Sequence, residues 1–243
     1  MYLAGMKTAL TLLFAAALTP IFGQTFFDAG LKGAIGPTLM FNQNIFDDGK
    51  YEHVLSWGYG FGGKLGVHFG KGGHHGVTFD YLRATSKQKF DLSNRQTHEY
   101  TWVTNDLLLM YRYSGNGAYV EFGPKLSLMA NVDSEYRGQP KQDVSKYFED
   151  KYTSLVFGFG SYILGTELLS LQAGVRLHWA LTDMISDEGI ANEPNSYPAL
   201  EASFTDYEKT TATAAQFSIE LNYAFGRFAK ASCSQRWRLI LFE

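Results

Sequence analysis

The chain has 243 residues, a formal net charge of −3 and an aromatic content of 16% that is dominated by 19 Phe and 15 Tyr. This charge balance excludes the basic footprint of a nucleic-acid-binding protein. The single cysteine, Cys233, excludes an intramolecular disulfide and a Cys/His metal knuckle. Many aromatic residues and 25 Gly beside only 6 Pro favour strands and tight turns.

The first segment of the chain, residues 1–23, is predicted to be a secretory signal peptide. Lys7 supplies a positive charge, Ala9–Phe22 is apolar, and Gly23-Gln24 offers a cleavage site after a small residue. The alternative is an uncleaved N-terminal helix. No later stretch approaches the 18 apolar residues of a spanning helix, so the mature chain is expected to be secreted, periplasmic or a membrane barrel.

Residues 24–228 are predicted to form an all-β, transmembrane, antiparallel up-and-down barrel of eight strands, with ten strands as the alternative. Most of the alternating runs that indicate this fold are 12 to 16 residues long, which exceeds the usual strand of about five or six residues. A tilted membrane strand needs about 9–11 residues in the hydrocarbon alone. The eight runs are 29–41, 55–69, 76–90, 99–113, 118–130, 152–163, 169–183 and 213–228.

The connections between these runs alternate in length. The short ones are 70–75, 114–117 and 164–168, and Ser114-Gly115-Asn116-Gly117 is a hairpin signature. Outer-membrane barrels have short periplasmic turns and long external loops, so the pattern predicts periplasmic termini and a location in the cell outer membrane. The long, polar connections are 42–54, 91–98, 131–151 and 184–212.

The two faces of each run differ in the size of their side chains. In the run 55–69, large residues such as Trp57 and Phe61 alternate with Gly58, Gly60 and Gly62. A water-exposed face has no need of so many glycines, whereas a narrow lumen does. We therefore expect the large face to meet lipid, with a soluble ligand-binding barrel as the alternative. The aromatic residues expected at the membrane interfaces are Trp57, Tyr59, Tyr111, Tyr113, Trp179 and Tyr223.

The predicted lumen face carries charges of both signs. In so narrow a space they are expected to pair and to plug the barrel rather than to line an open pore. The cations are Lys32, Lys64, Arg112, Lys125 and Arg176, and the anions are Asp80, Asp106, Glu121 and Glu220.

No catalytic, cofactor-binding or metal-binding residue is predicted. His74-His75 lies in a turn without a third ligand. His98, Asp183 and Ser186 fall near the external rim, but no spacing marks them as a triad. His68 and His178 are expected to be structural lumen residues. The acidic loop residues show no fixed calcium-ligand spacing and comprise Asp183, Asp187, Glu188, Glu193 and Glu201.

Short segments across the mature chain resemble the Bacteroidota outer-membrane β-barrel family whose best-known members are PorT-like. They are Gly30-Leu31-Lys32-Gly33, Glu121-Phe122-Gly123-Pro124-Lys125, Phe157-Gly158-Phe159-Gly160 and Leu181-Thr182-Asp183. The resemblance implies a barrel in the outer membrane, and PorT itself is linked to type IX secretion and gliding. Two features depart from the expected pattern. Residues 229–243 continue past Phe228 as a C-terminal tail or extra strand, and Pro124 is expected to sit at a bulge.

These features together predict an integral, non-enzymatic outer-membrane barrel that acts as a scaffold or partner-docking component, with a link to secretion or surface assembly. Its expected partners are outer-membrane lipid and proteins of secretion or surface assembly, with no nucleic acid and no cofactor. A small solute or ion pore is the first alternative. A lipid hydrolase active at the rim is the second.

Overall fold

The computed structural model describes residues 25–47, 51–70, 73–92, 97–136, 139–166, 168–191, 206–230 and 237–240, the last two ranges from residue 226 onward by backbone pairing only. The predicted signal peptide, residues 1–23, lies outside the described residues.

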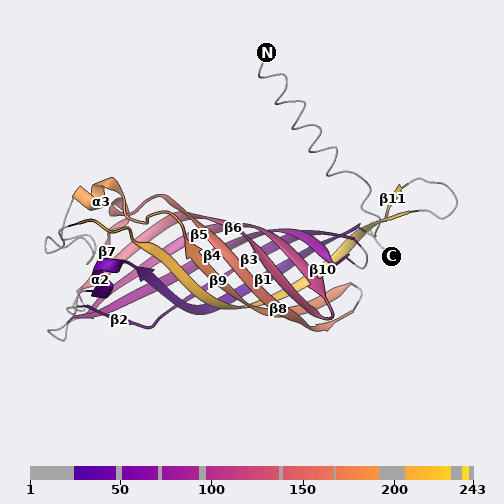
Figure 1. Ribbon diagram of the computed structural model, residues 1–243, viewed down its shortest axis with the longest axis horizontal. Helices are drawn as coiled ribbons and strands as arrows, with labels where there is room; N and C mark the ends of the chain where they lie inside the picture. Colours follow the sequence, from indigo (N-terminus) through magenta and orange to yellow (C-terminus); the bar gives the residue numbers. More distant parts are fainter. Residues whose placement is uncertain are drawn as a thin grey trace, which may run out of the picture.

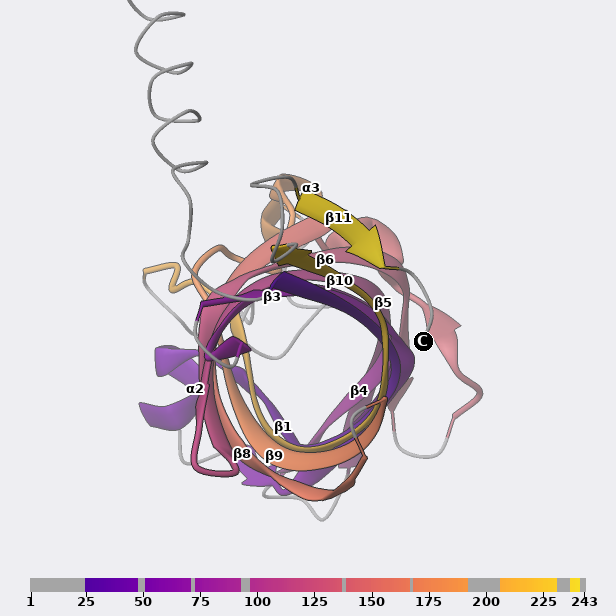
Figure 2. The ribbon, with the colours of Figure 1, turned by 90° about the vertical axis from the view of Figure 1, so that its right-hand side faces the viewer.

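Eight long strands form the wall of a closed antiparallel barrel (Figure 1). Each strand pairs with the next along the chain, and β10 pairs with β1 to close the ring, which Figure 2 shows end-on. The strands are β1 (Thr25–Phe41), β3 (Ser56–Phe69), β4 (His75–Leu92), β5 (Thr97–Gly115), β6 (Ala118–Tyr136), β8 (Lys151–Gly165), β9 (Leu169–Ala180) and β10 (Thr211–Lys230).

The eight predicted runs are confirmed, and the main differences lie at their ends. The run expected to stop at residue 130 continues to Tyr136, because β6 keeps pairing with β5 as far as His98. The run expected to reach residue 183 ends at Ala180. The wall is therefore taller on the β4–β6 side than on the β9 side.

The long connections gather at one end of the barrel and carry short elements of their own (Figure 1). We call this the loop end and the opposite end the turn end. No helix among the described residues is long and apolar enough to cross a membrane. The loop-end elements are α2 (Gln43–Asp47), β2 (Tyr51–Val54), which pairs with β4, β7 (Gln142–Asp143), which pairs with β6, η2 (Ser145–Tyr147) and α3 (Asp187–Ala191).

Tight turns at the turn end depend on residues that tolerate a positive φ. Asn116 and Gly117 have φ values of 52° and 80° in the β5–β6 hairpin, as a two-residue hairpin with primed-turn geometry requires. Gly70 and Gly73 have φ values of 86° and 70° between β3 and β4. The predicted hairpin at residues 114–117 is confirmed.

The bulge expected at Pro124 is wrong. Leu108 pairs with Lys125 and Tyr111 with Phe122, so β5 and β6 keep one register across the proline. Since proline has no N–H to donate, the ladder is interrupted there without an inserted residue. The irregularity between these strands lies instead at Val103/Thr104.

The chain returns after β10 in a short strand, β11 (Trp237–Ile240). This strand pairs only with Arg227–Lys230, whereas the pairing of β9 with β10 ends at Leu169 opposite Tyr223. It therefore lies beyond the end of β9 and adds no strand to the eight of the wall.

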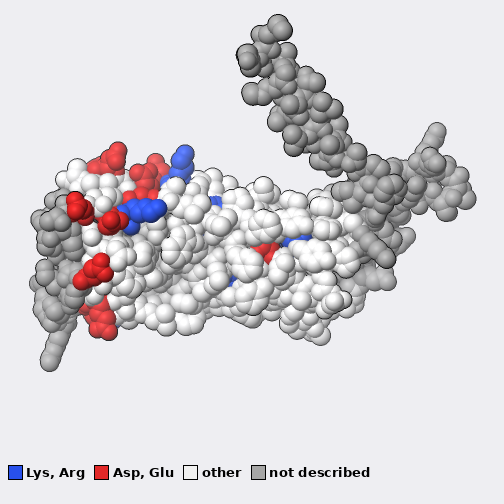
Figure 3. All heavy atoms as spheres, viewed as in Figure 1, with Lys and Arg blue, Asp and Glu red and all other residues white. Residues whose placement is uncertain are grey.

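The outside of the wall is a belt of exposed large apolar side chains. Its middle carries almost no charge in Figure 3, while acidic side chains gather at the loop end. Trp57 and Trp179 lie toward the loop end of the belt, and Tyr113 and Tyr223 lie toward the turn end, as expected of interfacial aromatic residues. The belt includes Leu65, Phe79, Leu109, Phe122, Phe157, Phe159, Leu177 and Ile219.

Replacing Phe157 by Arg tests whether this belt faces lipid. Phe157 pairs with Phe122 and Leu177 on the neighbouring strands and is about half exposed, so the charge would lie in hydrocarbon. We expect the free energy of unfolding in lipid vesicles to fall by about 2–4 kcal/mol. The control is Thr153→Arg, on the same face of β8 at the loop end, which should cost roughly 0–1 kcal/mol. Equal effects at both positions would contradict the membrane assignment.

Candidate functional site: the barrel interior

Six charged side chains form a closed ring of alternating sign across the lumen. One member, Glu220 on β10, joins two of the cations. It accepts a hydrogen bond from Arg112 Nη2 at 2.8 Å and forms an ion pair with Lys32. The side chains of all three are fully buried. Two cations from distant strands, β1 and β5, therefore converge on one carboxylate.

The other half of the ring is closed by Arg176. Its Nη1 lies 2.8 Å from Asp80 Oδ2, and its Nε donates to Glu121 Oε1 at 2.6 Å. Asp80 accepts from Lys32 Nζ at 2.7 Å, and Glu121 accepts from Arg112 at 2.7 Å. The ring thus runs through Lys32, Asp80, Arg176, Glu121, Arg112 and Glu220, from β1, β4, β9, β6, β5 and β10.

Further pairs extend the ring toward both ends of the barrel. Lys64 on β3 lies 3.3 Å from Glu220 and 3.1 Å from Asp28. Lys125 donates to Asp106 at 3.4 Å on the loop-end side. With these pairs the buried lumen holds five Lys or Arg against five Asp or Glu, so it carries no formal net charge.

The predicted lumen network is confirmed in all nine of its residues, and Asp28 is the residue that the sequence interpretation missed. The predicted first run begins at Ala29, whereas β1 begins four residues earlier, at Thr25. The alternation that places Lys32 and Gly30 inward places Asp28 inward as well, so the signal was present. His68 is also inside, 3.2 Å from Asp28, and His178 is buried in the lumen.

The large side chains of the ring fit inside the barrel because small residues lie beside them on the wall. Gly158 on β8 lies against Glu121 and Arg176, and a methyl group there would come within 3.1 Å of both side chains. Arg112 also donates to Gln172 at 2.7 Å and packs over the ring of Tyr119. Buried charges are tolerated only when they are paired and hydrogen-bonded, as these are.

The loop-end half of the interior is apolar instead. Fully buried Phe90, Tyr100 and Trp102 from the wall pack with Phe148 and Met184 from the loop-end connections. We call this cluster the apolar cap. The barrel is thus closed twice, by an ionic ring in the middle and by an apolar core at the loop end.

His98, Asp183 and Ser186 are not joined by any hydrogen bond or ion pair in the described structure. His98 Nε2 lies 2.8 Å from Ser134 Oγ, and Asp183 accepts from the Tyr207 hydroxyl at 2.6 Å. Ser186 donates to the carbonyl of Lys146 at 3.0 Å. Each of the three side chains therefore serves a different local contact at the loop end.

The paired histidines of the β3–β4 turn point to separate partners. His74 Nδ1 donates to the carbonyl of Ser114, and His75 Nδ1 lies 2.6 Å from the Tyr111 hydroxyl. No group of three or more potential metal ligands occurs among the described residues. Glu193 and Glu201 of the acidic loop lie outside the described part of the chain.

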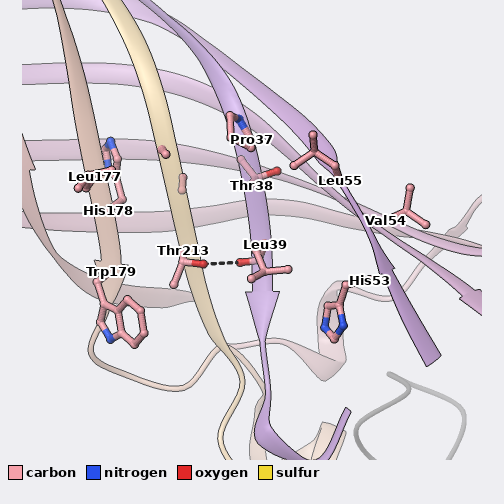
Figure 4. A pocket seen from close by; sticks show the side chains of 12 residues that line it. Pro37, Thr38, Leu39, His53, Val54, Leu55, Leu177, His178, Trp179 and Thr213 are labelled. Carbon is pink, nitrogen blue, oxygen red and sulfur yellow. Dashed lines mark hydrogen bonds between the residues drawn. The ribbon is translucent and has the colours of Figure 1, made fainter. Parts of the chain in front are cut away.

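A cavity of about 510 Å³ opens on the outer surface near the loop end (Figure 4). Leu177 and Trp179 form one side, Leu39 comes from β1, and Leu55 lies between β2 and β3. Thr213 donates to the Leu39 carbonyl at 3.4 Å. No Asp, Glu, Lys or Arg lines it, so it continues the lipid-facing belt.

No protein-family profile and no curated protein matches the chain. Among solved structures it is similar to Neisserial surface protein A at 9% identity over 82% of this chain and 98% of that one, with a TM-score of 0.37. The outer membrane protein OprG from Pseudomonas aeruginosa gives 11% identity, coverages of 84% and 96%, and a TM-score of 0.42. The attachment invasion locus protein Ail of Yersinia pestis gives 10%, 83% and 99%, and 0.31.

The fold assignment therefore depends on the strand pairing and the two surfaces of the wall. A closed eight-stranded antiparallel ring, a mostly apolar, aromatic-rimmed belt outside on which Arg83 is exposed, and paired charges inside are the features of outer-membrane barrels. The chain is an integral outer-membrane β-barrel.

Replacing Glu220 by Gln tests the ring. The variant leaves Lys32, Lys64 and Arg112 with one anion fewer, and we expect the free energy of unfolding to fall by about 3–5 kcal/mol. Adding Lys64→Met restores the charge balance and should recover part of the loss. The control, Glu99→Gln, breaks the more exposed pair with Lys87 and should cost roughly 0–1 kcal/mol. A loss no larger than the control would contradict a stabilising ring.

His98 makes the loop end sensitive to acid. It lies outside the membrane belt, where neighbouring outer positions are Lys89 and Glu99, and burial lowers its pKa from 6.5 to about 4. The unfolded chain therefore binds a proton below pH 6.5 that the folded chain refuses until about pH 4, so stability falls as pH drops through this window. His98→Gln should flatten that dependence. Titration of the ring protons by NMR with a pKa near 6.5 would contradict this.

Proposed function

We propose that the protein is a closed, non-conducting outer-membrane barrel that works as a scaffold or docking component for partner proteins, without catalysis of its own. The six-membered charge ring is the observation that carries the proposal. It occupies the lumen with side chains that cannot leave without exposing unpaired charge. A barrel sealed in this way is suited to holding other proteins at the membrane rather than to passing solutes.

The tall β4–β6 side of the wall supports the docking part of the proposal. Beyond the belt, the outer face of these strands carries Lys87, Glu99 and Asp133 and is stiffened from inside by the apolar cap. A projecting, packed and charged wall offers a preformed surface, which lowers the entropic cost of binding. We place this end outside the cell and both termini in the periplasm, as the short turns beside the termini suggest.

The resemblance to the PorT-like barrels agrees with a role in secretion or surface assembly. It is carried by short segments, and two of them, Gly30–Gly33 and Glu121–Lys125, contain members of the ring, Lys32 and Glu121. Two of the residues that seal the lumen therefore lie in segments that carry the resemblance.

Affinity purification from native outer membranes tests this function. A tag inserted between α3 and β10 leaves the wall intact, and mild detergent preserves membrane complexes. We expect a heat-shifted barrel band together with a protein partner at fixed stoichiometry. The same tag in an unrelated eight-stranded barrel is the control and should not retain that partner. A barrel that is repeatedly recovered alone from its own membranes would contradict a docking role.

A further inference from the structure

The turn end of the lumen holds a cavity of about 350 Å³ on the other side of the ring from the apolar cap. We call it the vestibule. Its floor consists of Asp28, His68, Gln172 and Asn222, which are all buried inside the wall. It is therefore a built recess between the ring and the turn end, and the paired charges separate it from the loop end.

Part of this floor has hydrogen-bonding capacity that the protein does not use. Asn222 is 2% exposed, and neither its Oδ1 nor its Nδ2 has a hydrogen-bond partner within the described residues. Asp28 contacts Lys64 and His68 through Oδ2, while its Oδ1 is unpartnered there. Each buried polar atom without a partner lowers the stability of the fold by about 1–3 kcal/mol. A ligand that hydrogen-bonds to these atoms would offset that cost.

The neighbouring strands make room for both side chains. A methyl group at Gly30 would collide with Asn222 Oδ1, and one at Gly66 would collide with Asp28 Oδ1. Gly30 and Gly66 therefore let these two groups lie flat against the wall beside the cavity. Gln172, by contrast, is already engaged, since it accepts from Arg112 at 2.7 Å.

The mouth of the vestibule carries two leucine side chains beside Thr166. Leu164, at the end of β8, and Leu168, just before β9, line it and are exposed, at 69% and 44%. A molecule that enters from the turn end thus meets leucine side chains first and the free polar atoms of the floor last. This order selects a ligand with one compact polar end and an apolar body.

The floor also specifies the chemistry of that polar end. His68 Nε2 makes no hydrogen bond but lies 3.2 Å from Asp28 Oδ2. The other floor atoms without a hydrogen-bond partner among the described residues are two acceptors, Asp28 Oδ1 and Asn222 Oδ1, and one donor group, Asn222 Nδ2. An amide supplies the matching donor and acceptor. A carboxylate would instead face Asp28, and an added charge of either sign would upset the balance of five cations and five anions.

We propose that the vestibule binds a small, neutral, amide-bearing molecule with an apolar body, which enters from the turn end. The cavity volume lies at the lower end of the usual range for small-molecule sites. The inference is independent of the docking role, because ligand binding here requires neither conduction nor a partner at the loop end.

The test uses the full-length mature barrel in lipid nanodiscs and N-acetyl-leucinamide as the probe. We expect saturable NMR shifts of the Asn222 side-chain amide, with a dissociation constant on the order of millimolar. N-acetyl-leucine, which carries a carboxylate in place of the carboxamide, should bind at least about tenfold more weakly. Absence of saturable shifts, or equal binding of the two probes, would overturn the proposal.

Two matched variants complete the test. Asn222→Leu removes the free amide and should weaken binding of N-acetyl-leucinamide at least about tenfold. Gln216→Leu makes the same kind of change on the same strand, on the loop-end side of the ring, and should leave binding unchanged. Mobility of unboiled samples on gels verifies that both variants fold. Unchanged binding in a folded Asn222→Leu variant, followed through backbone amides near the vestibule, would overturn the assignment.

Discussion

The structure depends on one constraint, which is that six charged side chains must share the interior of an eight-stranded barrel without leaving any charge unpaired. An eight-stranded wall encloses only enough space for side chains. Glu220, Glu121 and Asp80 each contact two or more cations. Removing any member of the ring therefore leaves an unpaired charge buried in the low-dielectric interior. The register of six strands is thereby tied to one set of contacts.

The division of the interior follows from this ring. On the turn-end side of the ring, the lumen is polar and contains the vestibule. On the loop-end side, the wall extends beyond the membrane and encloses the apolar cap, which includes Tyr100 and Trp102. In the belt the large side chains face lipid outside and the charges pair inside. Above the belt the arrangement is reversed, with Lys87 and Glu99 outside and the large side chains inside. One chain thus combines a membrane barrel and a short water-exposed barrel.

Much of this could be predicted from the sequence, because alternation with a period of two reports which face a residue occupies. It identified all eight strands and the nine ring and flanking charges. It could not show that Lys32 meets both Asp80 and Glu220, since β3 separates β1 from β4 and β1 meets β10 only because the barrel closes. The same alternation places Phe90 and Tyr100 on the inner face with Asp80 and Asp106. It could not show that they pack with Phe148 and Met184 of the loop-end connections into the apolar cap.

The proline at position 124 shows the limit of local rules. A missing donor predicted an inserted residue, yet pairing on both sides of Pro124 holds one register. The lumen contacts of Glu121 and Lys125 on the same strand require that register, because a slip of one residue would turn both charges toward lipid. The ring therefore outweighs the local loss of one hydrogen bond.

Single-channel recording in planar bilayers tests whether the paired charges seal the lumen. We expect the wild-type barrel to be silent, and also a folded variant in which Phe90, Tyr100 and Trp102 of the apolar cap are replaced by Ala, because the ring still closes the lumen. Replacing Lys32, Arg112 and Glu220 by Ala in that cap variant should produce conductance, because neither closure then remains. Reproducible conductance by the wild-type protein, or conductance of the cap variant that loss of the ring does not change, would contradict a lumen sealed by paired charges.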